Sequence, residues 1–152
     1  MSSLRPKLHH RSPPWVASGA TYFLTLCATD RIDARLTRAE ITSVLLDAAQ
    51  TYHPQRWWCH LWLVMPDHVH GLIALSSSES LAKVVGDWKR FTHRRTGAAW
   101  QPNFFDHRIR SHESLDEKLA YVRANPVRAG LAAANISWPW QWEPSPTARP
   151  IT

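Results

Sequence analysis

Cysteine is scarce in this sequence, and long apolar runs are missing. The two cysteines, Cys27 and Cys59, are too few for a disulfide framework, and no CxxC pair offers a structural zinc or redox centre. No stretch approaches the roughly 18 apolar residues that cross a bilayer. The polar, basic N-terminus is not followed by the apolar segment of a secretory signal. These absences predict a soluble protein of a reducing, cytoplasmic compartment.

Acidic residues are also in short supply, at 12 against 18 Lys and Arg, which gives a formal charge of +6. This balance favours a polyanionic partner. The chain of 152 residues, 44% hydrophobic, fits one core and is too apolar to be disordered. Seven cations gather between positions 83 and 110 and are candidate phosphate contacts, the alternative being plain solvated charge: Lys83, Lys89, Arg90, Arg94, Arg95, Arg108 and Arg110.

The periodicity of apolar residues predicts alternating strands and helices. Runs rich in β-branched and aromatic residues indicate four strands, at 20–28, 56–64, 69–75 and 104–110. Apolar residues at helical spacing indicate three helices, at 38–52, at 81–95 and from 115 to the proline at 126. Thr37 with Glu40 suggests a capping box, and Gly97 a helix stop. The order predicts an α+β fold, a ferredoxin-like (RRM-like) antiparallel sheet with helices on one face.

His68 and His70 form the first candidate site. In a strand, residues i and i+2 point to the same face about 6.6 Å apart, so two imidazoles can converge on one divalent ion. Nine histidines in the chain make one such pair by chance unsurprising. The spacing alone therefore leaves open a pair of half-exposed strand histidines. Asp67 beside them is expected in a turn or capping role.

Tyr121 and Asn125 form the second candidate site. Their i, i+4 spacing places a phenol and a carboxamide on one helix face. A phenol with a pKa of about 10 is a poor nucleophile at neutral pH, although a nearby cation lowers the cost of the phenolate. The alternative is a packing tyrosine, with an asparagine left at the helix end before Pro126.

Nine tryptophans are many for this length. Four of them are expected mostly in the core: Trp57, Trp58, Trp62 and Trp88. Four others lie in irregular segments and are candidates for stacking on unpaired bases: Trp100, Trp138, Trp140 and Trp142.

Four blocks of the sequence resemble the REP-associated tyrosine transposases, of the single-tyrosine branch of the HUH endonuclease superfamily. The blocks are MPDHVHGLI (65–73), WKRFT (88–92), WQPNFFDHRIRSHE (100–113) and EKLAYVRANPVRAGL (117–131). They follow the family's order and, with ATYFLT near the start, span roughly 20–131. The resemblance therefore predicts a catalytic domain at 20–131. Composition predicts a basic irregular arm before it (1–19) and an irregular Trp- and Pro-rich tail after it (132–152). The tail and the arm depart from the family's pattern.

The resemblance implies an enzyme that cuts single-stranded DNA near hairpin (REP-like) elements through a 5′-phosphotyrosine intermediate. It assigns His68 and His70 as metal ligands, Asn125 as a polar third ligand and Tyr121 as the nucleophile. The seven cations are expected as DNA contacts because of their charge. The implied ion is Mg²⁺ or Mn²⁺. The expected protein is cytoplasmic and nucleoid-associated, and monomeric or homodimeric.

Two other functions remain open from the residues. A non-catalytic single-stranded nucleic-acid binding module would use the same basic, aromatic surface without needing Tyr121. A metal-dependent hydrolase acting through bound water would form no covalent adduct.

Overall fold

A computed structural model describes residues 16, 20–110 and 113–144. The elements in chain order are β1 (Thr21–Cys27), α2 (Ala39–Tyr52), β2 (Trp57–Val64), β3 (His68–Leu75), α3 (Leu81–Thr96), β4 (Phe105–Arg108), α4 (Leu115–Arg123), α5 (Asn125–Arg128) and β5 (Gln141–Trp142). Apart from position 16, the predicted irregular arm lies outside the described residues, as does the tail beyond position 144. No described helix is long and apolar enough to cross a membrane.

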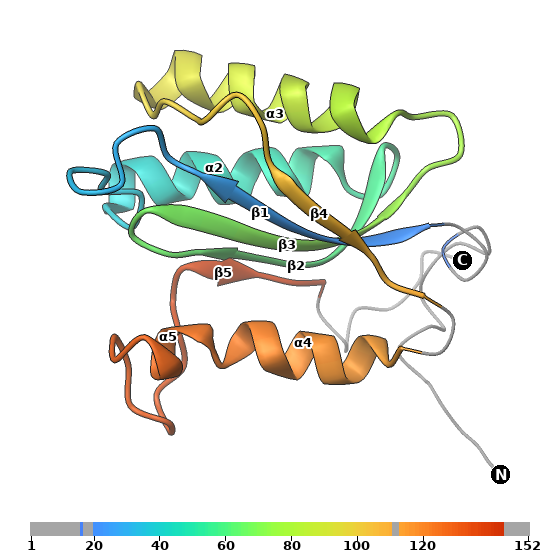
Figure 1. Cartoon of the computed structure of the whole chain (residues 1–152). Coiled ribbons are helices and arrows are strands. Elements are labelled where there is room, and N and C mark those ends of the chain that lie inside the picture. Colours follow the sequence, from blue (N-terminus) through green and yellow to red (C-terminus); the bar gives the residue numbers. More distant parts are fainter. Residues whose placement is uncertain (1–15, 17–19, 111–112, 145–152) are drawn as a thin grey trace, which may run out of the picture.

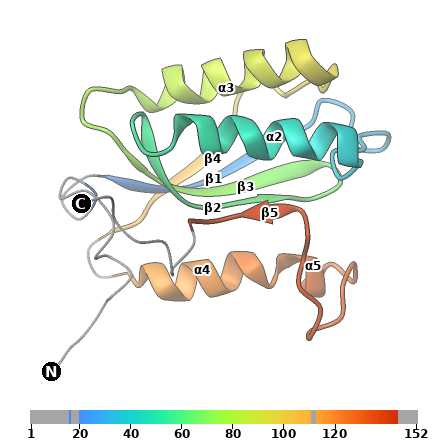
Figure 2. The ribbon, with the colours of Figure 1, turned by 180° about the vertical axis from the view of Figure 1, so that it is seen from behind.

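The five strands form one antiparallel sheet in the order β4-β1-β3-β2-β5. Its first four strands have the arrangement expected of the ferredoxin-like pattern, so the predicted α+β class is confirmed. The placement of the helices differs in one respect. Helices α2 and α3 cover one face, and α4 and α5 lie against the other (Figures 1 and 2). Helix α4 lies there because Leu119 and Val122 pack against Leu61 and Leu72 of that face.

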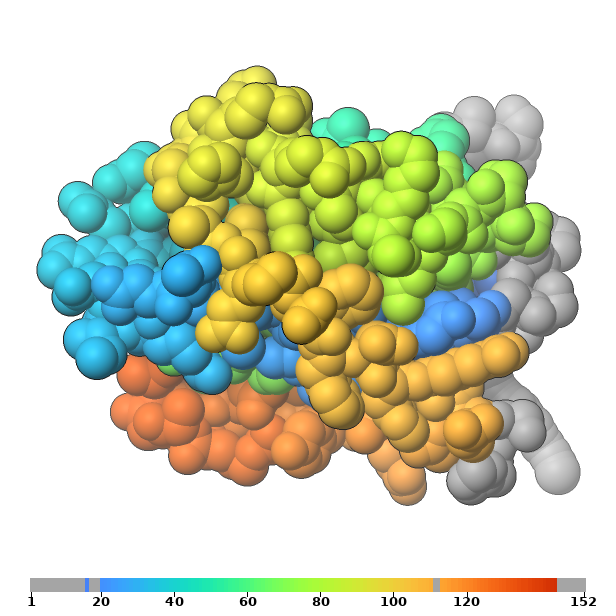
Figure 3. Space-filling view, turned by 45° about the horizontal axis from the view of Figure 1, so that its top comes forward, coloured from blue at the N-terminus to red at the C-terminus, as the bar shows by residue number. Residues whose placement is uncertain are grey.

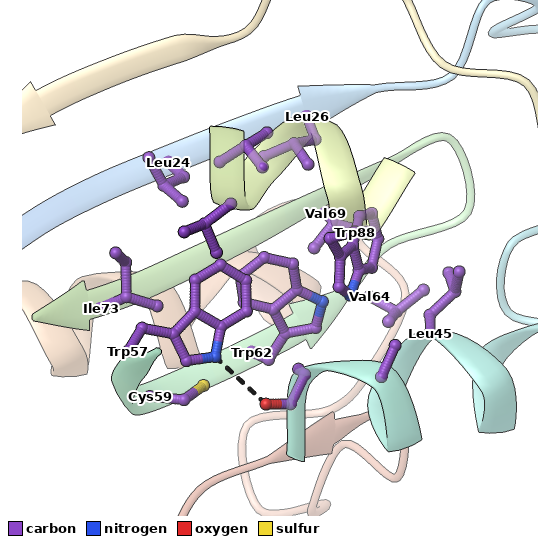
Figure 4. Packing of buried hydrophobic residues seen from close by; sticks show 14 of the residues in the cluster. Leu24, Leu26, Leu45, Trp57, Cys59, Trp62, Val64, Val69, Ile73 and Trp88 are labelled. Carbon is purple, nitrogen blue, oxygen red and sulfur yellow. Dashed lines mark hydrogen bonds between the residues drawn. The ribbon is translucent and has the colours of Figure 1, made fainter. Parts of the chain in front are cut away.

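Tryptophan dominates the core between the sheet and helices α2 and α3. Trp57, Trp62 and Trp88 are fully buried, and neighbouring rings in the series 57, 62, 88 and 100 have centroids 5.0 to 5.1 Å apart. The Trp57 indole donates a hydrogen bond to the Ala49 carbonyl of α2 (Figure 4). The predicted core role of these three residues is confirmed, whereas Trp58 is only partly buried.

A bulge in β2 decides which residues reach this core. The pairing of β2 with β3 shifts between Cys59 and Leu61, so one extra residue interrupts the alternation of the strand. Before the shift, Trp57 and Cys59 face α2, and after it Trp62 and Val64 do. If every residue of β2 alternated regularly, Trp57 and Trp62 would point to opposite faces.

The helix ends mostly agree with the sequence. Ser80 and Ser114 each accept a backbone hydrogen bond at the start of α3 and α4, and Gly97 ends α3 with a positive φ of 79°. At α2 the expected capping box is wrong, since the N-cap is Arg38 and makes no side-chain bond. The predicted irregular tail contains β5, which pairs with β2.

Candidate functional site

The histidine pair lies on the face of the sheet that α4 covers. Along β3, His68, His70 and Leu72 alternate with Val69 and Ile73. Leu72 packs in the cluster under α4, while Val69 and Ile73 pack in the cluster under α2 and α3. The strand therefore turns both imidazoles towards α4, and the predicted shared face is observed.

The two imidazoles point the same ring nitrogen at each other. His68 Nε2 and His70 Nε2 are 3.2 Å apart, and both side chains are partly buried. The other nitrogen of each ring, Nδ1, forms a hydrogen bond. His68 Nδ1 lies 2.7 Å from the Asp67 carboxylate, and His70 Nδ1 lies 3.1 Å from the Thr25 hydroxyl. A hydroxyl can donate or accept, so Thr25 suits either tautomer of His70. Rings fixed in this way meet the geometric demand of a metal site.

Asp67 therefore does more than form the turn expected from the sequence. Its second carboxylate oxygen accepts a hydrogen bond from Arg31 Nε at 2.9 Å. Burial works to raise the pKa of Asp67, but the hydrogen bonds to His68 and Arg31 hold it below the ordinary value. An ionised Asp67 favours the His68 tautomer whose Nε2 lone pair is free.

The environment of His70 favours its neutral form. Burial, followed by the neighbouring His68 and the charge of Arg128, lowers the pKa of His70 to about 4. The ring is then unprotonated at neutral pH, which is the form that binds metal ions.

The pair fits a bound divalent ion. Two nitrogens at about 2.1 Å from one ion lie about 3.0 Å apart in octahedral and about 3.4 Å apart in tetrahedral coordination. The observed 3.2 Å falls between these values. Within the described ranges, no cluster of three His, Cys, Asp or Glu side chains could hold an ion. Among the described residues, a further ligand would be of another kind, such as the predicted amide oxygen of Asn125.

Tyr121 lies on α4 with an exposed side chain and two positively charged groups close to its ring. Its exposed fraction is 53%. Arg128 Cζ lies 4.0 Å from the ring centroid, and Lys118 Nζ lies 5.5 Å from it. Lys118 Nζ is also 5.6 Å from the ring of Phe23, which stacks on His70. Lys118 thus links the phenol to the histidine pair.

Arg128 connects Tyr121 to Asn125. One guanidinium nitrogen donates to the Tyr121 carbonyl at 3.0 Å, and another donates to Asn125 Oδ1. The Asn125 Nδ2 atom is buried and has no hydrogen-bond partner among the described residues. The amide oxygen proposed as a third ligand is therefore engaged by Arg128.

The predicted DNA-binding cations are not gathered around the histidine pair. Five belong to α3, which lies across the sheet from α4, as Figure 3 shows with β1 and β4 between the two helices: Lys83, Lys89, Arg90, Arg94 and Arg95. Lys89 donates to the carbonyls of Gln101 and Asn103, and burial lowers its pKa. Arg90 pairs with Asp87. Arg108 and Arg110 lie at and beyond the end of edge strand β4.

The tryptophans predicted as stacking candidates are partly buried. Trp100 donates to Thr92 Oγ1, and Trp138 donates to the Val64 carbonyl. Trp140 and Trp142 pack against the core under α2 and α3. These rings are largely used within the fold, and none of the four is exposed.

Sequence reasoning missed four residues around the site: Thr25, Arg31, Lys118 and Arg128. Two of them carried a signal, because positions 118, 121, 125 and 128 follow the helical spacing of one face. Thr25 and Arg31 carried none. They reach the histidines through strand pairing and loop folding, which a single sequence does not display.

Comparison with known proteins finds sequence relatives and solved structures that are similar to this chain. A REP-associated tyrosine transposase of Escherichia coli (strain K12) is 24% identical over 127 residues, which cover 80% of this chain and 75% of that protein. A protein of Haemophilus influenzae (strain ATCC 51907 / DSM 11121 / KW20 / Rd), whose provisional name is the same, is 25% identical over 139 residues, with coverages of 80% and 78%. No family model matches the chain.

One of the solved structures is that of a REP-associated tyrosine transposase bound to a REP hairpin. It aligns with a TM-score of 0.64 and 20% identity, over 98% of this chain and 95% of that one. This similarity shows that the two share a fold.

Proposed function

Because the chain is a homologue of the REP-associated tyrosine transposases, as its sequence blocks predicted, we propose that it cleaves and rejoins single-stranded DNA in a metal-dependent reaction with Tyr121 as nucleophile. The proposed substrate carries a REP-like hairpin, since a protein of the same fold binds one. One observation carries the proposal. A convergent pair of imidazoles and an exposed phenol flanked by cations lie on the same face of the sheet.

The proposed step exchanges one phosphodiester for another. The phenol oxygen of Tyr121 forms a bond to phosphorus, and the bond from phosphorus to the 3′ oxygen breaks. The downstream strand stays attached through its 5′ phosphate, and the upstream strand leaves with a 3′-hydroxyl that takes up a proton. The phosphotyrosine retains the bond energy, so rejoining needs no external energy source.

Each residue has a distinct part in this proposal. His68 and His70 would hold Mg²⁺ or Mn²⁺, which as a Lewis acid would draw charge from the phosphate oxygens. Asn125 would contribute its amide oxygen once Arg128 turns to the DNA. Lys118 and Arg128 stabilise negative charge on the phenol oxygen and on the phosphate.

Replacing Tyr121 by Phe tests the nucleophile. Wild-type protein incubated with Mn²⁺ and hairpin-bearing single-stranded oligonucleotides is expected to form an adduct that survives denaturing electrophoresis. Tyr121→Phe removes one exposed oxygen, so it is expected to fold, bind the same DNA and form no adduct. Tyr22→Phe and Tyr52→Phe are the controls and should keep the activity, because both rings pack against the core under α2 and α3.

The outcomes also separate the other functions. Cleavage without an adduct would indicate the hydrolase acting through water. Hairpin binding without cleavage by wild type, over a library that includes the hairpins flanking the source gene, would indicate a binding module. An adduct formed by Tyr121→Phe would refute the nucleophile.

A further inference from the structure

Two aromatic rings are exposed among the large hydrophobic residues that the structure describes. They are Tyr121, with an exposed fraction of 53%, and Phe105, with 57%. Tyr121 is the proposed nucleophile, whereas nothing so far uses Phe105. An exposed phenylalanine contributes little burial to folding, so its position requires another reason.

Phe105 lies on the same face of the sheet as the histidine pair. It pairs in register with Thr25, whose hydroxyl contacts His70. Its ring meets the ring of Phe23 edge to face, with centroids 6.2 Å apart at 71°. Phe23 in turn stacks on His70, with centroids 5.2 Å apart at 29°. Three rings therefore run from the proposed metal site to the edge strand β4.

Positive charge borders this row of rings. Lys118 Nζ is 5.6 Å from the Phe23 centroid and 5.5 Å from the Tyr121 centroid. Arg128 Cζ lies 4.0 Å from the Tyr121 centroid. An exposed aromatic ring beside ammonium and guanidinium groups suits a ligand that joins a flat ring to a phosphate. A protein partner would instead favour a broader apolar patch.

We propose that Phe105 stacks on an unpaired nucleobase close to the phosphate that Tyr121 attacks. This inference rests on the proposed function and adds a base-binding position to it. The row of rings would set the distance from the stacked base to the metal site, and therefore which phosphate reaches Tyr121. Stacking accepts any base, so Phe105 would select the position of the cut more than its sequence.

A double-mutant cycle between the ring and the base tests the proposal. Hairpin oligonucleotides with one abasic site, moved stepwise along the single-stranded flank, are titrated against wild type, Phe105→Ala, Phe105→Trp and Ile136→Ala. For wild type, one abasic position is expected to weaken binding by about 5- to 150-fold, the range that stacking of one base supplies. For Phe105→Ala, the same abasic site should weaken binding little further, because the ring that stacks on the base has already been removed. In Phe105→Trp the abasic site should again weaken binding as in wild type, because an indole can stack on a base.

Ile136→Ala is the matched control, since Ile136 is also 57% exposed but lies in the loop after α5. It should behave as wild type. Unchanged Mn²⁺ affinity in Phe105→Ala verifies that the site stays folded.

If Phe105→Ala shows the wild-type pattern of losses while the Tyr121 adduct still forms, the base position is refuted and the proposed function stands. If wild type neither binds the library nor forms an adduct, both fail. If Phe105→Ala converts a dimer to a monomer and leaves the abasic pattern unchanged, the ring is a protein contact and the proposal is refuted.

Discussion

The two faces of the sheet are built from different residues. The face under α2 and α3 is closed by buried leucines, valines and the indoles of Trp57, Trp62 and Trp88. The face under α4 has a smaller apolar cluster, and beside it lie His68, His70 and exposed rings. Helix α4 covers only part of its face, so polar groups there remain open to a ligand. The larger core under α2 and α3 therefore leaves the other face free to hold polar groups.

The largest expected effect is on the free energy of unfolding, when the central indole of the tryptophan core, that of Trp62, is removed. Trp62→Ala deletes a fully buried side chain and should cost about 3 to 5 kcal/mol of unfolding free energy. Urea denaturation measures this cost. Trp58→Ala, at a partly buried position, is the control with a smaller expected loss. Folded Trp62→Ala should keep its Mn²⁺ affinity, and a parallel loss of both would contradict the independence of the two faces.

Gly71→Ala tests how closely the same indole packs on β3. A Cβ at this position would lie 2.4 Å from Cζ3 of Trp62, whose ring is fully buried and cannot move aside freely. We expect a loss of about 1 to 3 kcal/mol in thermal or urea unfolding. Gly86→Ala in α3 is the control. Its nearest atom would be 3.4 Å away on the flexible Arg90 side chain, so the better helix propensity should stabilise the protein by up to about 1 kcal/mol. A neutral Gly71→Ala would mean that the ring has room.

Asp67→Asn should produce the opposite pattern, with metal binding weakened and stability kept. The substitution removes the carboxylate that orients His68, which should weaken Mn²⁺ binding by about 10- to 100-fold in calorimetry. The ion pair with Arg31 is partly exposed, so unfolding should change by less than about 1 kcal/mol. Asp47→Asn, at an exposed position of α2, should leave both unchanged. Equal Mn²⁺ affinity for Asp67→Asn and wild type would remove the positioning role.

The smallest expected effect shows on which side of the sheet the single-stranded DNA binds. Lys118→Gln should reduce the log-log salt slope of single-strand binding by about 0.7, the contribution of one phosphate contact. Arg94→Gln removes an equal charge from the other side of the sheet and should leave the slope unchanged. The reverse result would place the DNA on α3, as the charge distribution along the sequence predicts.

The sequence predicted the elements better than their arrangement. Strands and helices were found because alternation and helical spacing are local properties. The prediction that all helices lie on one face of the sheet was wrong for α4. The pattern of an amphipathic helix shows which of its residues are buried, but it does not show which face of the sheet they pack against. The two-residue strand β5 is too short to display any period.

The site was predicted in the same uneven way. The two histidines share a face because the spacing of a strand guarantees it. The contact between Asp67 and His68 was missed because β3 begins at His68, so strand alternation does not apply to the residue before it. The charge-rich α3 was expected to bind DNA, yet a count of cations cannot show that the sheet separates them from the histidines.

The bulge in β2 has a consequence for comparing and engineering relatives. Deleting the one residue between Cys59 and Leu61 would restore simple alternation and keep both faces, because the pairs on either side of it are consecutive on β3. If that residue were kept and every residue of β2 alternated regularly, Leu61 and Leu63 would turn towards the tryptophan core, and Trp62 towards the histidines. The position of the bulge is thus as constrained as the composition of the strand. Gaps in alignments and insertions of tags or domains are better placed in the loop after α5, where positions 133–137 are exposed.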